Sequence, residues 1–168
     1  EGSVFFAAWT DQRLHRLDVG AGWGSGSTEP VALTPEPVVP AGDRYADGVV
    51  TADGAWVLCV RERHRPDGAE ARNEIVAVRT TPGPGGPGEP VVVVAGHDFV
   101  SHPRIDPSGR LLSWLAWDHP NMPWDGTELW VADLASGDGD GAPIVRGASV
   151  VLGGAEVSVA QPSWTPDG

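Results

Sequence analysis

Hydrophobic and polar residues alternate along short runs of the chain, and segments rich in glycine and proline separate these runs. Alternation with a period of two is typical of β-strands that bury one face. Valine and tryptophan are frequent in the runs, as strands favour, and 23 glycines and 16 prolines among 168 residues indicate many turns. The pattern therefore predicts an all-β protein. The clearest runs are residues 55–62 (AWVLCVRE), 73–80 (NEIVAVRT), 110–118 (RLLSWLAWD) and 127–134 (TELWVADL).

Two kinds of segment recur along the chain at similar intervals. The turns TADG, DPSG and TPDG end at glycines that lie 55 and 59 residues apart, namely Gly54, Gly109 and Gly168. Aligned positions in a second set of apolar runs lie 61 and 54 residues apart, at Leu14, Ile75 and Leu129. A repeat of roughly 40–60 residues that holds four short strands is typical of a β-propeller blade. The sequence thus predicts a partial β-propeller of four-stranded antiparallel blades, with strands A to D counted from the axis outward.

The repeat divides the chain into four units. Residues 1–42 form an incomplete blade with strands B to D, residues 43–97 and 98–150 form full blades, and residues 151–168 form the first strand of a further blade. Residues 22–28 are expected to form a hairpin loop. The chain starts at strand B of one blade and ends after strand A of another, so we expect it to be a piece of a larger protein. Self-association through the open blade edges is an alternative.

Charge and composition narrow the classes of partner. The chain has 23 acidic residues and 11 basic ones, all arginine, for a net charge of −12, which argues against a nucleic-acid partner. No apolar run approaches the ~18 residues of a membrane span. The single cysteine, Cys59, has no internal disulfide partner and is expected to be a buried thiol. We expect a cytoplasmic and bacterial protein, with an export signal left open because the chain begins in mid-strand.

No cofactor and no metal ion are expected. The glycine-rich segment 136–143 (SGDGDGAP) resembles a short calcium loop. It lacks the later bidentate glutamate and the full spacing of such a loop, so we assign it as the connection between strands C and D.

The most specific stretch of the sequence is residues 114–134 (WLAWDHPNMPWDGTELWVADL), in which two tryptophan-rich runs flank a polar loop between strands B and C. A second B–C connection, residues 61–74 (RERHRPDGAEARNE), is rich in arginine and glutamate. Such side chains can bind the amino terminus or a carbonyl group of a peptide. We expect a substrate-gating or interdomain role for Asp118, His119, Asn121, Trp124, Asp125, Arg61, Arg63 and Glu74.

Structural roles are the alternative for the residues of the first loop. Asp118 and Asp125 can cap turns through hydrogen bonds to the backbone. Trp124 can pack against Pro120 and Pro123 and stiffen the loop, and His119 can be a satisfied hydrogen-bonding partner.

The segment FVSHPRIDPSGRLLSWLAWDHPNMPWDGTELWVADL, followed by GGAEVSVAQPSWTPDG, resembles the propeller of prolyl-oligopeptidase-family serine peptidases. The acylaminoacyl-peptidase and dipeptidyl-aminopeptidase branch is the most similar. The resemblance implies a C-terminal α/β-hydrolase domain with a Ser-Asp-His triad, which the B–C loops of the propeller would face. It also implies that the propeller caps the active site and admits short peptides. The chain contains no Gly-x-Ser-x-Gly elbow, so we expect no catalytic residue within it.

Two other functions stay open. One is a stand-alone TolB-like propeller that binds other proteins. The other is a carbohydrate-active propeller. Such an enzyme needs a histidine or carboxylate cluster together with a metal ion, and His97, Asp98 and His102 are weak support for such a cluster.

Overall fold

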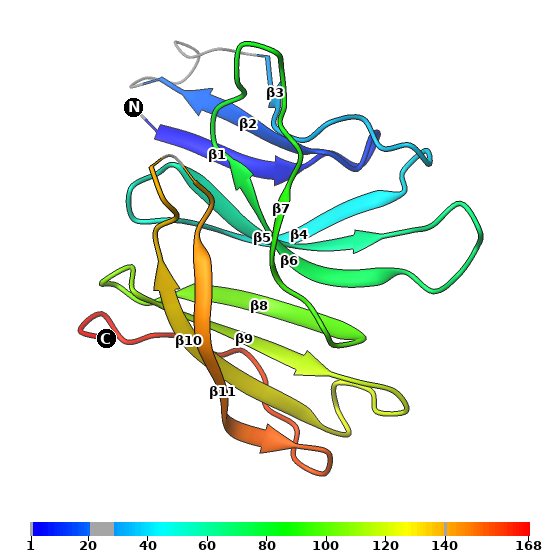
Figure 1. The fold of residues 1–168 in the computed structure, drawn as a ribbon, viewed down its shortest axis with the longest axis vertical. Coiled ribbons are helices and arrows are strands. Elements are labelled where there is room, and N and C mark those ends of the chain that lie inside the picture. Colours follow the sequence, from blue (N-terminus) through cyan, green and yellow to red (C-terminus); the bar gives the residue numbers. More distant parts are fainter. Residues whose placement is uncertain (1, 21–28, 140) are drawn as a thin grey trace.

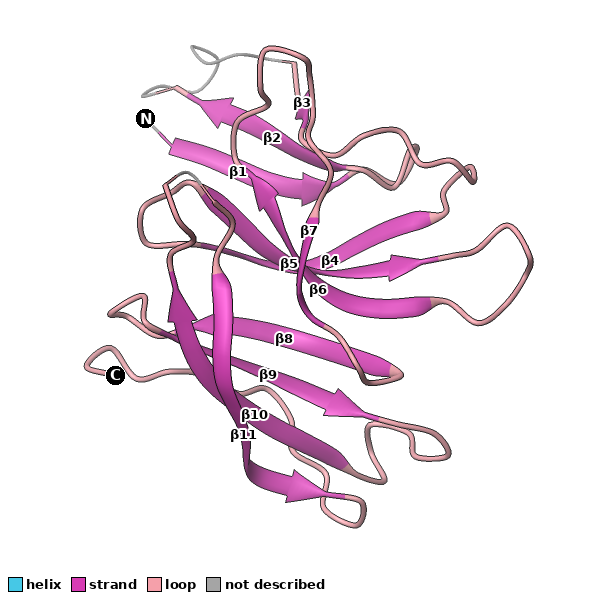
Figure 2. Ribbon diagram, in the orientation of Figure 1, coloured by secondary structure: helices cyan, strands magenta, loops and turns pink. Residues whose placement is uncertain are grey.

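The computed structural model describes residues 2–20, 29–139 and 141–168, and every regular element in this part of the chain is a β-strand (Figures 1 and 2). The hairpin loop expected at residues 22–28 lies outside the described residues. No helix in the described ranges is long and apolar enough to cross a membrane.

The strands form three antiparallel sheets in which neighbours in the sequence are neighbours in space. Sheet 1 contains β1 (Gly2–Ala7), β2 (Leu14–Val19) and β3 (Val31–Ala32). Sheet 2 contains β4 (Asp43–Val50), β5 (Trp56–Arg63), β6 (Arg72–Arg79) and β7 (Val91–Val94). Sheet 3 contains β8 (Phe99–Ile105), β9 (Leu111–Trp117), β10 (Thr127–Ala135) and β11 (Ile144–Gly154). The sheets are arranged like successive blades (Figure 1), which confirms the predicted fold class.

The end of the chain differs from the prediction in two respects. Strand β11 continues to Gly154 rather than ending by residue 150, and two bulges accommodate its extra length against β10. No strand is found among residues 155–168, where we expected strand A of a further unit. The strand that would pair with it in a hairpin is not within the chain. Instead, the segment lies near β8, where Trp164 Nε1 donates to the carbonyl oxygen of Arg104 at 3.1 Å. The assignment of residues to four blades stays a prediction.

Sheet 2 is buried on both faces. On one face, Leu58 and Ile75 pack against sheet 3, and on the other, Cys59 and Val76 pack against sheet 1. All four are fully buried, which explains why this run is continuously apolar rather than strictly alternating. Burial raises the pKa of the Cys59 thiol to about 12, so the cysteine is a packing residue and a poor nucleophile.

The innermost strands carry the same backbone irregularity. Asp47 in β4 and His102 in β8 have φ angles of 55° and 52°, and Gln161 has a φ of 52°. These residues lie 55 and 59 positions apart, which are the intervals of the repeated turns. Pairing with the next strand is interrupted at both β4 and β8, as in a β-bulge. The Asp47 carboxylate accepts a hydrogen bond from the amide of His102 at 3.2 Å, so it joins the bulges of two neighbouring sheets.

The turns between strands A and B are held by the side chain of their first residue. In the second full unit this residue is Asp106, which is 7% exposed. One carboxylate oxygen accepts from the amides of Arg110 and Leu111, both at 2.7 Å, and the other accepts from Ser108. Burial alone would raise the pKa of Asp106, but the hydrogen bonds outweigh burial and lower the pKa to about 2.

We expect Asp106→Asn to destabilise the protein in a pH-dependent way. The folded-state pKa of about 2 lies below the ordinary value of 3.8, so ionisation stabilises the folded state above pH 4. This contribution is lost as the pH falls from about 4 to about 2. The shift corresponds to about 2 kcal/mol in the free energy of unfolding near neutral pH.

Urea denaturation of both proteins at pH 7 and at pH 2.5 measures this effect. The matched control is Asp167→Asn, because Asp167 is an exposed aspartate of the last turn. Equal losses for the two variants at pH 7, or the same loss for Asp106→Asn at both pH values, would contradict the prediction.

Candidate functional site

The B–C and D–A connections gather at one end of the molecule, on the right in Figure 1. They are residues 8–13 between β1 and β2, 33–42 between β3 and β4, 64–71 between β5 and β6, 95–98 between β7 and β8, and 118–126 between β9 and β10. The A–B turns lie at the opposite end. We call the first end the loop end, and it holds the residues that the sequence analysis singled out in residues 118–126.

Two histidine–aspartate pairs join the D–A connection to the longer B–C loop. His97 Nδ1 lies 3.0 Å from Asp118 Oδ2, and the amide of Asp98 donates to Asp118 Oδ1 at 2.6 Å. In the reverse direction, the amide of His119 donates to Asp98 Oδ2 at 2.9 Å, and His119 Nδ1 lies 3.0 Å from the same oxygen. We call these four residues the latch. The amide and ring of His119 hold the pKa of Asp98 below its ordinary value.

The latch also contacts sheet 2. His119 Nε2 lies 3.4 Å from a carboxylate oxygen of Glu70, in the neighbouring B–C loop. Asn73 Nδ2 donates to the carbonyl oxygen of Asp98 at 2.7 Å. Phe99 stacks on the Trp117 ring, with centroids 5.3 Å apart, and its ring lies 5.1 Å from that of His119. Residues from two sheets therefore meet at the latch.

The rest of the long B–C loop is fixed by hydrogen bonds to the backbone. Asp125 Oδ2 accepts from the amide of Met122 at 3.0 Å, and Asn121 Nδ2 donates to the carbonyl oxygen of Ala155 at 2.8 Å. Trp124 is 69% exposed, so it projects into solvent and is not buried against its neighbouring prolines. The structural alternative describes Asp118, His119 and Asp125 well. Trp124 is different, because its side chain is exposed on the surface of the loop.

The second B–C loop is shorter than the sequence analysis predicted. Strand β5 continues to Arg63 and β6 begins at Arg72, so the loop spans only residues 64–71. Arg61 and Glu74 are opposite each other across these strands and form an ion pair, with the Arg61 side chain only 3% exposed. Arg63 Nε and Nη2 donate to the two oxygens of Asp43 at 2.9 Å each.

Placing Arg61, Arg63 and Glu74 in a loop was therefore wrong. Opposite charges at facing positions of neighbouring strands pair with each other. An alternating stretch that contains charged residues can therefore form a strand as well as a loop. The hydrogen bonds that Arg63 donates to Asp43 raise the pKa of Arg63.

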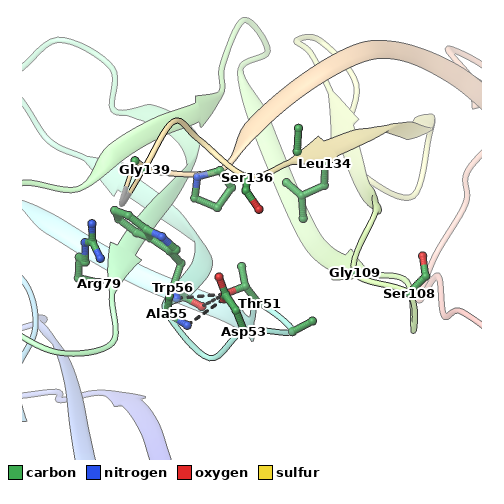
Figure 3. Close-up of a pocket in the computed structure, with 14 residues that line it drawn as sticks. Thr51, Asp53, Ala55, Trp56, Arg79, Ser108, Gly109, Leu134, Ser136 and Gly139 are labelled. Carbon is green, nitrogen blue, oxygen red and sulfur yellow. Dashed lines mark hydrogen bonds between the residues drawn. The ribbon is translucent and has the colours of Figure 1, made fainter.

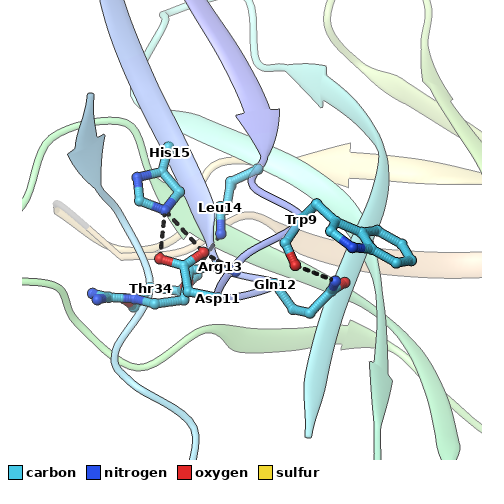
Figure 4. Close-up of polar contacts among 7 residues, drawn as sticks. All are labelled: Trp9, Asp11, Gln12, Arg13, Leu14, His15 and Thr34. Carbon is cyan, nitrogen blue, oxygen red and sulfur yellow. Dashed lines mark hydrogen bonds and ion pairs between the residues drawn. The ribbon is translucent and has the colours of Figure 1, made fainter. Parts of the chain in front are cut away.

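The sequence analysis missed the B–C loop of sheet 1, drawn in Figure 4. The Asp11 carboxylate holds His15 Nε2 at 3.0 and 3.2 Å, and Arg13 donates to the carbonyl oxygen of Thr34. Trp9 points away from this cluster (Figure 4) and is 89% exposed. The strand repeat would have revealed this loop, because it joins the runs equivalent to those that flank residues 118–126.

A separate hollow of about 270 Å³ opens among the turns at the opposite end, between sheets 2 and 3 (Figure 3). The Arg79 guanidinium carbon lies 4.3 Å from the centre of the Trp56 ring that forms one wall, a geometry of cation–π attraction. None of the residues named in the sequence analysis as site candidates lines this hollow. Within the described ranges, no group of three or more histidine, cysteine and carboxylate side chains is placed to hold a metal ion.

Comparison with known proteins identifies similar structures. No protein-family model and no curated protein matches the chain. A puromycin-hydrolysing peptidase of Mycobacterium tuberculosis is 41% identical over 96% of the chain, with a TM-score of 0.81. A puromycin hydrolase is 35% identical over 99% of the chain, with a TM-score of 0.83. The chain spans 24% of the length of each of these proteins.

A putative TolB from Agrobacterium tumefaciens is 18% identical over 99% of the chain and 51% of its own, with a TM-score of 0.62. At this identity the likeness supports the propeller-type fold only.

We expect Asp98→Asn to loosen the long B–C loop without unfolding the sheets. The substitution keeps the shape of the side chain but replaces the charged carboxylate, which contacts both the amide and the ring of His119, with a neutral amide. Hydrogen bonds to a charged acceptor contribute more than neutral ones. Amide hydrogen exchange of His119 and of its neighbours in the loop should therefore accelerate several-fold, as measured by NMR or mass spectrometry.

Asp67→Asn is the matched control, because Asp67 forms an exposed pair with Arg65 within the other B–C loop. An unchanged exchange rate at His119 in Asp98→Asn, or the same acceleration in both variants, would show that the latch does not hold the loop.

Proposed function

The chain is a β-propeller portion of the prolyl oligopeptidase family, and on this basis we propose that it is the noncatalytic, substrate-gating part of a serine peptidase. In this proposal, a catalytic α/β-hydrolase domain of the same parent protein faces the loop end. The propeller covers the active site and admits short peptides, with acyl-aminoacyl, dipeptidyl or oligopeptidyl bonds as the targets. The parent protein is proposed to be bacterial and cytoplasmic.

The observation that carries the proposal is the near-complete match to peptidases of about four times its length. Identities of 35–41% extend over 96–99% of the chain. The similar proteins hydrolyse puromycin, a small molecule, which favours small substrates for the parent protein. The sequence of the chain contains no nucleophile elbow, so the proposal places the catalytic residues outside it.

The loop end offers suitable groups for such a role. Trp9, Met122 and Trp124 are 89%, 44% and 69% exposed on loops whose backbone is fixed by hydrogen bonds. Exposed aromatic and methionine side chains are enriched where protein surfaces bury each other. A loop held by the latch can present Trp124 in one position, either against a neighbouring domain or across a path for peptides.

A stand-alone TolB-like propeller for protein interaction is the runner-up. Its support is the fold-level likeness to a putative TolB, which is weaker than the identity to the peptidases. No observation at the described residues of the loop end supports a carbohydrate-active propeller.

The test begins with the coding sequence beyond Gly168. We expect further blades and then an α/β-hydrolase domain with a Gly-x-Ser-x-Gly elbow, and we expect the full gene product to cleave short peptide substrates. In that protein, Trp124→Ala should raise kcat/KM for a peptide of about 20 residues relative to a dipeptide. The reason is that removing the indole widens the proposed entrance.

Val151→Ala is the matched control, because Val151 is also exposed, at 55%, but lies on β11. A gene that ends without a hydrolase domain would overturn the peptidase proposal. An active peptidase whose size selectivity is the same in Trp124→Ala and in the control would overturn the gating role of this loop.

A further inference from the structure

The arginines of the β5–β6 hairpin differ in whether a carboxylate compensates their charge. Arg61 and Arg63 have the partners described above, and Arg65 Nη2 lies 2.6 Å from Asp67 Oδ2. Arg72, the first residue of β6, is exposed. It has no ion pair or side-chain hydrogen bond with any residue that the structure describes.

The position of Arg72 makes its lack of a partner significant. Arg72 lies directly opposite Arg63 across the two strands, and like charges at facing positions repel each other. Asp43 binds Arg63 through both of its oxygens and so compensates only one of the two charges. Among the described residues, this hairpin therefore holds one guanidinium group that no carboxylate pairs with.

Arg72 lines a hollow of about 320 Å³ at the loop end, between residues 71–74 and residues 95–98. Two carboxylates also line it, and both are engaged elsewhere. Glu74 is paired with Arg61, and Asp98 accepts from the amide of His119. Arg72 is thus the charged side chain of this wall that has neither an ion pair nor a hydrogen bond within the described part of the chain.

We propose that this hollow binds the carboxylate end of a short peptide, with Arg72 as the group that recognises the anion. The inference rests on the proposed function, since it gives the chemistry by which the loop end selects its peptide. The sequence analysis expected a substrate-gating or interdomain role for Arg61 and Arg63 and did not single out Arg72.

The chemistry of the hollow suits such a ligand. A guanidinium group presents paired donors that match the two oxygens of a carboxylate. Asn73 Nδ2 is used by the carbonyl oxygen of Asp98, which leaves Asn73 Oδ1 as an acceptor for a peptide N–H. The volume is at the lower end of the range for small-ligand pockets, roughly 300–1,000 Å³, so it fits a terminus rather than a long segment.

The test compares two probes that differ only at the carboxylate, N-acetyl-dialanine and its C-terminal amide. Saturation-transfer NMR observes the ligand, so the full gene product can be used whatever its size. We expect the carboxylate form to bind about fivefold more tightly than the amide, as for a solvent-exposed ion pair of about 1 kcal/mol. Arg72→Gln should abolish this preference, and Arg72→Lys should keep part of it.

Arg65→Gln is the matched control, because Arg65 belongs to the same hairpin and is already paired. Equal affinities of the wild-type protein for the two probes, or a preference that survives Arg72→Gln, would overturn the inference. The nucleophilic serine of the proposed catalytic domain is replaced by alanine in every variant, so that binding is measured without hydrolysis of either probe. A protein that cleaves peptides but shows no carboxylate preference would therefore refute this site and leave the proposed function standing.

Discussion

The packing of sheet 2 between its two neighbours is the constraint on which the rest of the structure depends. Leu58 and Ile75 are fully buried on one side, and Cys59 and Val76 on the other. Each face of this sheet needs a partner, because only contact with another sheet removes its apolar side chains from water. The blades therefore stabilise one another, and the connections at their ends can carry polar groups that contribute little to the core.

The same arrangement explains how an acidic chain accommodates buried charge. Arg61 and Glu74 lie at facing positions of one hairpin, where the geometry of the sheet brings their charges together. Removing either partner would leave the other uncompensated in a low-dielectric environment, at a much greater cost than the pair itself. Asp106 solves the same problem with donors of its own turn. Charged side chains inside the sheets are thus paired with nearby groups. A charged side chain without such a partner at the loop end is therefore a candidate for binding a ligand.

Much of the fold could be predicted from the sequence because its signals are local. The alternating runs predicted β5, β6, β9 and β10 to within one residue at each end, and the repeated turns predicted their grouping into sheets. Strand ends were harder to predict where charged residues continue the alternation, which is why Arg63 and Arg72 were assigned to a loop although they lie in β5 and β6. The positive φ angles at Asp47 and His102 had no sequence signal, since neither residue is glycine. They depend on contacts between sheets.

The sequence singled out the long B–C loop, but the contacts that its residues make could not be predicted. The sequence identified residues 118–126 by their unusual composition, yet most of their side chains bind the backbone or the latch. Charge pairing decides which residues are available, and pairing depends on strand register, which spacing alone does not give. Arg72 was overlooked for this reason, because in the sequence it is one arginine among four.

The latch joins residues at the ends of β8 and β9, but its contacts with Glu70 and Asn73 and the hollow beside it depend on two packed blades. Asp98 lies between β7 and β8, Glu70 belongs to the hairpin of sheet 2, and His119 follows a strand of sheet 3. A shift of one sheet against the other would separate Glu70 from His119 while leaving each hairpin intact. Core substitutions between Leu58 and Leu112, far from the loops, would therefore alter the loop end through the relative position of the sheets. The geometry of the candidate site is in this sense set by the same apolar contacts that hold the fold together.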